Sequence, residues 1–244
     1  MDQFLRETGL LDFSHAAIER IVRERGWRGL EPFERIRAIY NFVRDEILFG
    51  YNVDDHIPAS KVLSDGYGQC NTKGILFMAL LRACGVPCRI HGFTIDKKLQ
   101  KGAMTGLVYA AAPSRILHSW VEVLLEDTWY ELEAFILDRP YLEKLQQANP
   151  GCTGAFCGYG VATADFQNPV IDFNRNHTYI QKEGINQDFG VYASPDELLE
   201  EHRQEMSPLK LFVYQNIGRH CMNRNINRIR AGRQNRPGAG PERR

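Results

Sequence analysis

The segment that most constrains the fold is CNTKGILFMALLRACG, at residues 70–85. Its apolar residues recur at helical spacing, and Gly85 is a typical residue for ending a helix. A helix this apolar has to be buried, so the rest of the chain must pack around it. The segment VPCRIHGFTI, at residues 86–95, follows at once. Its alternation and its β-branched residues predict a strand.

The segment RILHSWVEVLLEDTWYELEAFIL, at residues 115–137, predicts two antiparallel strands joined by a two-residue turn at Glu126–Asp127. With that turn, Leu125 pairs with Thr128. Continuing the same register places Trp120 opposite Glu133 and His118 opposite Phe135. We therefore expect His118 and Glu133 on one face of the sheet, at diagonal positions within reach of each other.

Two other carboxylates compete for the place beside His118. Glu131 shares the face but lies one pair further along, and Asp138 lies beyond the pairing. Strand parity therefore favours Glu133. A slip of one residue in the register would separate it from His118.

The remaining chain is less regular. We expect a helix over residues 14–25, capped by Ser14 and ended by Gly26, and a second helix that starts at Pro32. Further expected elements are a long ordered loop at 48–69, a short helix at 140–148, a helix from Ser194–Pro195 and a helix over 208–230. Residues 96–113 and 149–193 show no clear period.

The predicted organisation is one main domain with two additions at its C-terminal end. The ranges are 1–193 for the domain, with a motif core at 33–138, then 194–231 for a helical segment packed on it and 232–244 for a disordered basic tail.

Composition limits the classes of protein to consider. The chain is 43% hydrophobic and 25% charged with zero formal net charge, as in an ordinary globular protein. From Lys210 onward the net charge is +8, and the preceding residues carry −8. No apolar run approaches 18 residues, and the N-terminus lacks the pattern of a signal peptide. We therefore expect a cytoplasmic protein, without a membrane or nucleic-acid partner, whose six cysteines are free thiols.

Cys70 stands where a reactive thiol is expected, between GYGQ and the apolar helix. The first N–H groups of a helix lack intrahelical partners, and the helix dipole places partial positive charge there. Both effects stabilise a thiolate, and the same N–H groups can stabilise an oxyanion. Gly66 and Gly68 would allow the backbone and a substrate to approach closely.

Cys84 and Cys88 lack such a setting and are expected to be structural. With His91 they match no strong zinc-binding spacing, and the sequence predicts no metal site and no cofactor. Cys70, His118 and Glu133 instead supply a nucleophile, a base and a residue that orients the base. These are the three parts that covalent acyl chemistry requires.

At these residues the chain resembles the transglutaminase-like superfamily of papain-like cysteine enzymes, as a small bacterial-type member. The segment ASKVLSDGYGQCNTKGILFMALLRACGVPCRIHGF is similar to the family's cysteine block, HSWVEV to its histidine strand and WYELE to its acidic block. The resemblance implies an α+β fold, in which N-terminal helices and the helix of the cysteine pack on an antiparallel sheet. It also implies that Cys70 is the nucleophile, His118 the base and Glu133 the acid, although the family usually has aspartate at the third position.

The resemblance further implies a protease, amidase, deamidase or transglutaminase-type transferase that acts on a peptide, protein or small amide through a thioester. We expect the N–H of Cys70 to bind the oxyanion, with the side chain of Gln69 or Tyr67 as a second donor, and Trp120 to lie in the substrate cleft. His177 and Tyr179 are further candidates for lining the cleft.

Two alternatives remain open. Arylamine N-acetyltransferases use a cysteine, a histidine and an acid in the same order, but this chain lacks their Arg-Gly-Gly approach to the cysteine. The second alternative is an inactive binding module that uses the basic C-terminal segment. In that segment Arg219, Arg224, Arg228 and Arg230 recur on a predicted helix.

Overall fold

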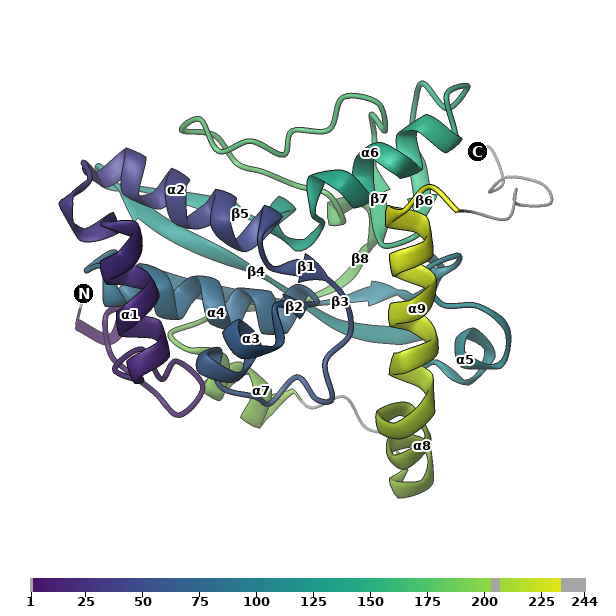
Figure 1. The fold of residues 1–244 in the computed structure, drawn as a ribbon, viewed down its shortest axis with the longest axis horizontal. Coiled ribbons are helices and arrows are strands. Elements are labelled where there is room, and N and C mark those ends of the chain that lie inside the picture. The colour runs from purple at the N-terminus through teal and green to yellow at the C-terminus, as the bar shows by residue number, and fades with distance from the viewer. Residues whose placement is uncertain (1, 203–206, 234–244) are drawn as a thin grey trace.

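The computed structural model describes residues 2–202 and 207–233, and its main feature is a four-stranded antiparallel sheet with helices packed on it (Figure 1). The strand order is β5-β4-β3-β8. The α+β class, with N-terminal helices and the helix of Cys70 against an antiparallel sheet, is confirmed. The helices are α1 (Ala16–Arg25), α2 (Pro32–Asp45), α3 (Ala59–Asp65), α4 (Cys70–Ala83), α5 (Gly106–Ala111), α6 (Arg139–Ala148), α7 (Pro195–Glu201), α8 (Pro208–Val213) and α9 (Arg219–Arg230). The strands are β1 (Leu48–Phe49), β2 (Tyr67–Gly68), β3 (Cys88–Asp96), β4 (Arg115–Leu125), β5 (Thr128–Leu132), β6 (Phe156–Gly158), β7 (Val161–Thr163) and β8 (Ile185–Tyr192).

Helix α4 is the centre of the molecule, as its composition predicts. Every residue from Cys70 to Arg82 is buried, and α1, α2, α3 and β4 pack around the helix. Even Lys73 is fully buried, and its Nζ donates hydrogen bonds to the carbonyls of Arg44 and Ile136 at 3.1 and 3.0 Å. Burial disfavours the ammonium and lowers the pKa of Lys73 to about 7.

The hairpin of β4 and β5 has the predicted turn. Leu125 pairs with Thr128, and Glu126 and Asp127 have φ values of 50° and 60°, as a two-residue turn of type I′ requires. The pairing ends at Val121 and Leu132, however. The predicted opposition of Trp120 and Glu133 is therefore wrong, because the chain leaves the ladder at Glu133 and enters the 3₁₀ turn Ala134–Ile136.

The backbone conformation of this turn leads to a prediction about stability. Asp127 holds a left-handed backbone that glycine adopts without a Cβ clash, so Asp127→Gly should raise the free energy of unfolding by about 0.5 kcal/mol and Tm by about 1–2 °C. Thermal melts monitored by circular dichroism measure this change. Thr128→Gly, one residue later in the strand, is the matched control and should lower Tm. An unchanged or lower Tm for Asp127→Gly would contradict the assignment of strain.

Two local expectations are wrong, and one region without a predicted element contains strands. Helix α1 is capped by His15, whose Nδ1 accepts from the N–H of Ala17, and not by Ser14. Residues 48–69 are not one long loop, since they contain β1, α3 and β2. Residues 149–193 contain β6, β7 and the sheet strand β8, whose weak apolar pattern hid it.

The C-terminal helices return to the part of the chain that precedes α4. Asn223 of α9 exchanges hydrogen bonds with the backbone N–H and carbonyl of Tyr51 at 2.7 and 3.0 Å. Arg230 donates to both carboxylate oxygens of the buried Asp138 at 2.9 and 2.6 Å and to the carbonyl of Phe49. This pairing opposes the effect of burial and holds the pKa of Asp138 below its usual value.

Arg230 is thus occupied inside the fold, and it is not available for the binding surface considered in the second alternative. The expected basic tail lies, from residue 234 onward, outside the described residues. The proposed division into a domain and a helical segment stays a prediction. Within residues 2–202 and 207–233, a helix with the length and apolar character needed to cross a bilayer is not found.

Candidate active site

Cys70 is the first residue of α4, and the loop before it is built tightly. Gln69 is the N-cap residue, and its backbone N–H donates to Thr72 Oγ1 at 3.0 Å. A Cβ at Gly68 would lie 2.7 Å from the same oxygen, so only glycine fits there. The Cys70 side chain is 8% exposed, and it forms part of the wall of a large cavity. The predicted position at a helix start is therefore present.

His118 and Glu133 are in contact. His118 lies in β4 and pairs with Phe93 of β3, while Glu133 lies one residue past the end of β5. The two side chains are fully buried, and His118 Nε2 is 2.6 Å from Glu133 Oε1. The prediction by strand parity thus named two residues that meet, although the ladder ends before reaching Glu133.

The second oxygen of Glu133 is held by the backbone. Oε2 accepts hydrogen bonds from the N–H groups of Ile180 and Gln181 at 2.7 and 2.8 Å. These donors fix the carboxylate, which in turn fixes the imidazole plane of His118. They are backbone groups of an irregular segment, so no side-chain pattern in the sequence could have predicted them.

The other ring nitrogen of His118 is left for the thiol. Nδ1 is buried and makes no hydrogen bond of ordinary geometry among the described residues. Burial disfavours the imidazolium, yet interactions with Cys70 and Glu133 outweigh it and raise the pKa of His118 to about 10. A protonated imidazole between a sulfur and a carboxylate is the arrangement of a thiolate–imidazolium pair.

A network of polar side chains supports the start of α4. Asp55 accepts hydrogen bonds from Gln69 Nε2 at 2.6 Å and from Asn71 Nδ2 at 2.9 Å, and Asn71 Oδ1 accepts from Ser119 at 2.9 Å. Burial raises the pKa of Asp55 although both amides oppose the shift. The network ties the loop before α4 to β4, and sequence reasoning missed it, because the three elements are distant along the chain.

The other predicted site residues have different positions. Gln69 lines the cavity beside Cys70, but one N–H of its amide is used by Asp55. Tyr67 is half-buried in β2 and is not among the described residues that line the cavity. Trp120 is buried against Phe93 and Tyr179, with ring centroids 4.1 and 5.6 Å away. The roles given to these residues stay predictions.

The competing carboxylates have other partners. Glu131 accepts a hydrogen bond from the hydroxyl of Tyr179, and its backbone N–H donates to His177 Nδ1 at 3.0 Å. Asp138 caps α6 and binds Arg230. Neither reaches His118, so Glu133 is the carboxylate at the imidazole.

The remaining cysteines are free thiols in other settings. Burial raises the pKa of Cys84 and of Cys88 to about 11, which keeps both thiols protonated and inert. The described residues contain no group of three or more histidine, cysteine, aspartate and glutamate residues placed to hold a metal ion.

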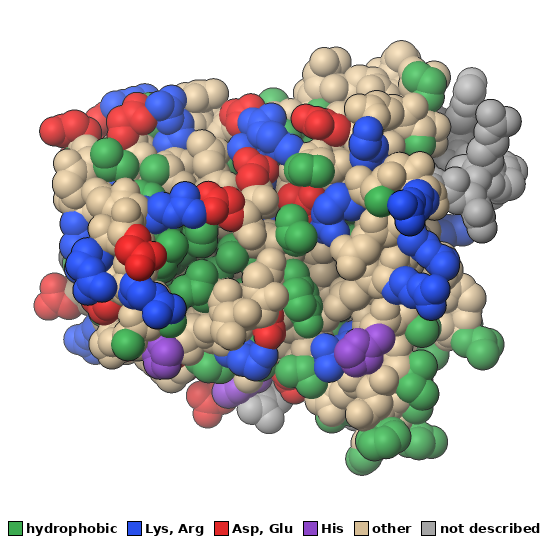
Figure 2. Space-filling view, viewed as in Figure 1, with side chains coloured by type: hydrophobic (Ala, Val, Ile, Leu, Met, Phe, Trp, Pro, Cys, Tyr) green, Lys and Arg blue, Asp and Glu red, His purple; other side chains and the backbone are tan. Residues whose placement is uncertain are grey.

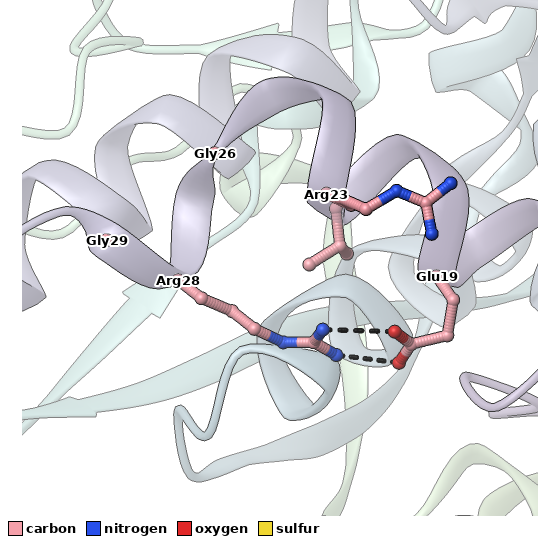
Figure 3. Close-up of a pocket in the computed structure, with 6 residues that line it drawn as sticks. Glu19, Arg23, Gly26, Arg28 and Gly29 are labelled. Atoms are coloured by element: carbon pink, nitrogen blue, oxygen red, sulfur yellow. Dashed lines mark hydrogen bonds and ion pairs between the residues drawn. The ribbon is translucent and has the colours of Figure 1, made fainter.

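A smaller depression of about 320 Å³ lies between α1 and the turn that follows it (Figure 3). Its polar content is the ion pair between Arg28 and Glu19, which are joined by two hydrogen bonds of 3.0 and 2.6 Å. Arg28 also donates to the carbonyl of Ala83, at the C-terminal end of α4. A helix of 14 residues is about 20 Å long, so this depression is remote from Cys70.

Known proteins give one informative match. Residues 15–134 match the family model of the transglutaminase-like superfamily, and no curated protein matches the chain. A proposed cysteine protease from Cytophaga hutchinsonii aligns over 80% of this chain and 47% of its own, with 12% identity and a TM-score of 0.42. Red sea bream transglutaminase aligns over 55% of this chain and 26% of its own, with 21% identity and a TM-score of 0.30. This chain thus spans less than half the length of either solved structure.

The matched range contains α4 with Cys70, β4 with His118 and the turn with Glu133, the same segments that carry the resemblance in the sequence. On this match, the chain belongs to the transglutaminase-like superfamily.

Proposed function

We propose that the chain is a cysteine-dependent acyl-transfer enzyme that acts on an amide bond, with Cys70 as nucleophile, His118 as base and Glu133 as the residue that orients the base. The observation that carries the proposal is the fully buried His118–Glu133 contact of 2.6 Å beside the first residue of α4. Burial of this kind positions the imidazole in one orientation, as catalysis by a nucleophile and a base requires.

The reaction starts from the pair in which the thiol proton of Cys70 has already passed to His118 Nδ1. The sulfur attacks the amide carbonyl, the S–C bond forms, and the C–N bond breaks as His118 returns the proton to the leaving amine. A thioester between the acyl group and Cys70 results. Water then attacks it with His118 as base, the C–S bond breaks, and the acid is released. An amine in place of the water gives transfer.

The oxyanion formed in each half-reaction needs hydrogen-bond donors. The backbone N–H of Cys70 is at the first position of α4, where helix geometry leaves it without an intrahelical acceptor. We assign it as one donor. The second hydrogen of Gln69 Nε2 is the nearest side-chain candidate for another, because the first is used by Asp55.

Alkylation by iodoacetamide between pH 6 and pH 9 tests the proposal without a known substrate. An ordinary exposed thiol reacts slowly at pH 6. Cys221 is an exposed cysteine and serves as the comparison. Cys70 should react at least about tenfold faster than Cys221 at this pH, because the proton resides on His118. Peptide mapping by mass spectrometry measures each site.

The control is His118→Ala, in which the rate at Cys70 should fall to that of an ordinary thiol and increase with pH. Cys84 provides an internal reference for a buried thiol, which should remain unlabelled. If Cys70 in the unaltered protein reacts no faster than Cys221 at pH 6, the proposed nucleophile is wrong.

A further inference from the structure

The cavity that Cys70 faces has a volume of about 940 Å³, at the upper end of the range for small-molecule sites. Apart from Gln100 and from Leu199 of α7, its walls come from four parts of the chain that are distant in the sequence. These are the loop at residues 51–56, the start of α4, the region of α5 from 104 to 117, and the segment from α8 to α9 at 209–222. In Figure 1, α5 and the segment from α8 to α9 lie on the same side of the molecule.

The wall of the cavity is predominantly hydrocarbon. Most of the residues that line it are aliphatic or aromatic, among them Val108, Ile116, Leu117, Leu211, Tyr214 and Met222. The charged residues Asp54, His56 and Lys210 are exposed. The remaining charged residue, Asp55, is engaged by Gln69 and Asn71.

Apart from the Cys70 N–H and the second Nε2 hydrogen of Gln69, which are assigned to the oxyanion, the buried polar side chains of the wall have partners within the protein. The Tyr51 hydroxyl donates to Gln100 Oε1 at 2.5 Å, and the Tyr214 hydroxyl donates to the carbonyl of Asn52 at 2.9 Å. The buried side-chain atoms without a partner belong, in the described part of the chain, to Arg82, His118, Trp120 and Gln181. None of these residues lines the cavity.

This arrangement distinguishes two classes of occupant. A peptide carries an N–H and a carbonyl at each residue, and burying them without partners costs about 1–3 kcal/mol per group. A hydrocarbon chain has no such groups, and each buried methylene contributes about 0.8 kcal/mol. Met104 and Met222 in the wall have flexible side chains that adjust to chains of different length.

Hydrophobic side chains continue to the entrance. Leu107 of α5 is 87% exposed, Leu209 of α8 is 73% exposed, and both line the cavity. Figure 2 shows hydrophobic side chains gathered over the end of the molecule that carries α8. A substrate with an apolar chain therefore meets apolar surface before it reaches Cys70.

We propose that the apolar cavity beside Cys70 binds a linear hydrocarbon acyl chain, so that the substrates are amides of long-chain fatty acids. This inference rests on the proposed function, since it places the acyl group that Cys70 attacks. The carbonyl of the substrate lies at Cys70 and the N–H groups of the helix start, and the alkyl chain extends along the wall formed by α5 and the segment from α8 to the start of α9. The amine leaves on the side of the carbonyl away from the cavity.

The test is a series of N-acyl 7-amino-4-methylcoumarin amides with acyl chains from 2 to 12 carbons. Cleavage by the full-length protein is followed by fluorescence, and each substrate is kept below the concentration at which it forms micelles. With each methylene worth about 0.8 kcal/mol, kcat/KM should rise about fourfold per methylene and by about 4 × 10³-fold from butanoyl to decanoyl. A flat series, or faster cleavage of the matching amides of apolar dipeptides, would overturn the inference.

Substitutions at two neighbouring alanines of α5 test where the alkyl chain of the substrate lies. Ala111 lines the cavity and its neighbour Ala110 does not, although both are exposed. Ala111→Phe should lower kcat/KM for the decanoyl substrate at least about tenfold more than for the acetyl substrate, whereas Ala110→Phe should leave the series unchanged. Equal effects of the two variants would contradict the inference.

Failure of the inference and failure of the proposed function give different results. In the Cys70→Ala variant the cavity remains, so titration calorimetry should still detect decanoic acid and should show weaker binding to the double variant with Ala111→Phe. If amide cleavage depends on Cys70 but not on acyl-chain length, the inference about the alkyl chain is wrong and the proposed function stands. If the protein binds decanoic acid but cleaves none of the amides, the proposed function is wrong and the cavity is still a binding site for alkyl chains.

Discussion

Replacing Cys70 with alanine is expected to lower kcat for amide cleavage at least about 10⁴-fold, because without the sulfur no thioester can form. The fold should survive, since only one small side chain at the end of α4 is shortened and the free energy of unfolding should change by about 1 kcal/mol or less. Activity is measured on the acyl-coumarin series, and mass spectrometry of the quenched reaction detects the acyl-enzyme in the unaltered protein.

Cys84→Ala is the matched control for this variant. Cys84 lies at the other end of the same helix, and its thiol is buried with a pKa raised to about 11. The Cys84→Ala variant should lose some stability and retain its activity. Residual cleavage by Cys70→Ala above about a hundredth of the original rate would show that another group is the nucleophile.

Glu133→Gln should lower kcat about 10⁴-fold by reversing the tautomer of His118. The N–H groups of Ile180 and Gln181 are donors and need an acceptor, so the amide oxygen will take the place of Oε2. The amide NH₂ then faces His118 Nε2, which must become an acceptor. The ring hydrogen moves to Nδ1, where the thiol proton would have to go, and a change of this kind costs about 10⁴ in a serine protease.

Two measurements separate this effect from loss of structure. Thermal melting should show a folded protein, and the alkylation rate of Cys70 at pH 6 should fall toward that of Cys221. Glu133→Asp keeps the charge and shortens the reach, so about a 10²-fold loss is expected from displacement of the imidazole. If Glu133→Gln retains more activity than Glu133→Asp, the tautomer argument is wrong.

The sequence predicted the elements whose apolar pattern is local. Helix α4, strand β3 and the hairpin of β4 and β5 were all recognisable, because a fully buried helix and alternating strands leave a strong periodicity. The contact of His118 with Glu133 followed from parity even though the last pairs of the ladder are absent. Glutamate in place of the family's usual aspartate suits this geometry, since its longer side chain reaches His118 from beyond the end of β5.

The elements that were missed depend on tertiary contacts. β8 has the sequence INQDFGVY, in which the apolar residues are few and do not alternate strictly, so its place at the edge of the sheet could not be read locally. The two N–H groups that hold Glu133 belong to the backbone at Ile180 and Gln181. The cavity is assembled from segments between residues 51 and 222, and no pattern within any one of them indicates a cavity.

The separation between the three proposed catalytic residues and the cavity wall has a consequence for how relatives of this chain could diverge. Cys70, His118 and Glu133 all lie within residues 15–134, whereas much of the wall belongs to residues 209–222, from α8 to the start of α9. Asn223 and Arg230 of α9 attach the end of this segment to Tyr51 and Asp138. Relatives that kept those attachment points could change the side chains of the cavity wall and so acquire different acyl preferences. Cys70, His118 and Glu133 would remain unaltered.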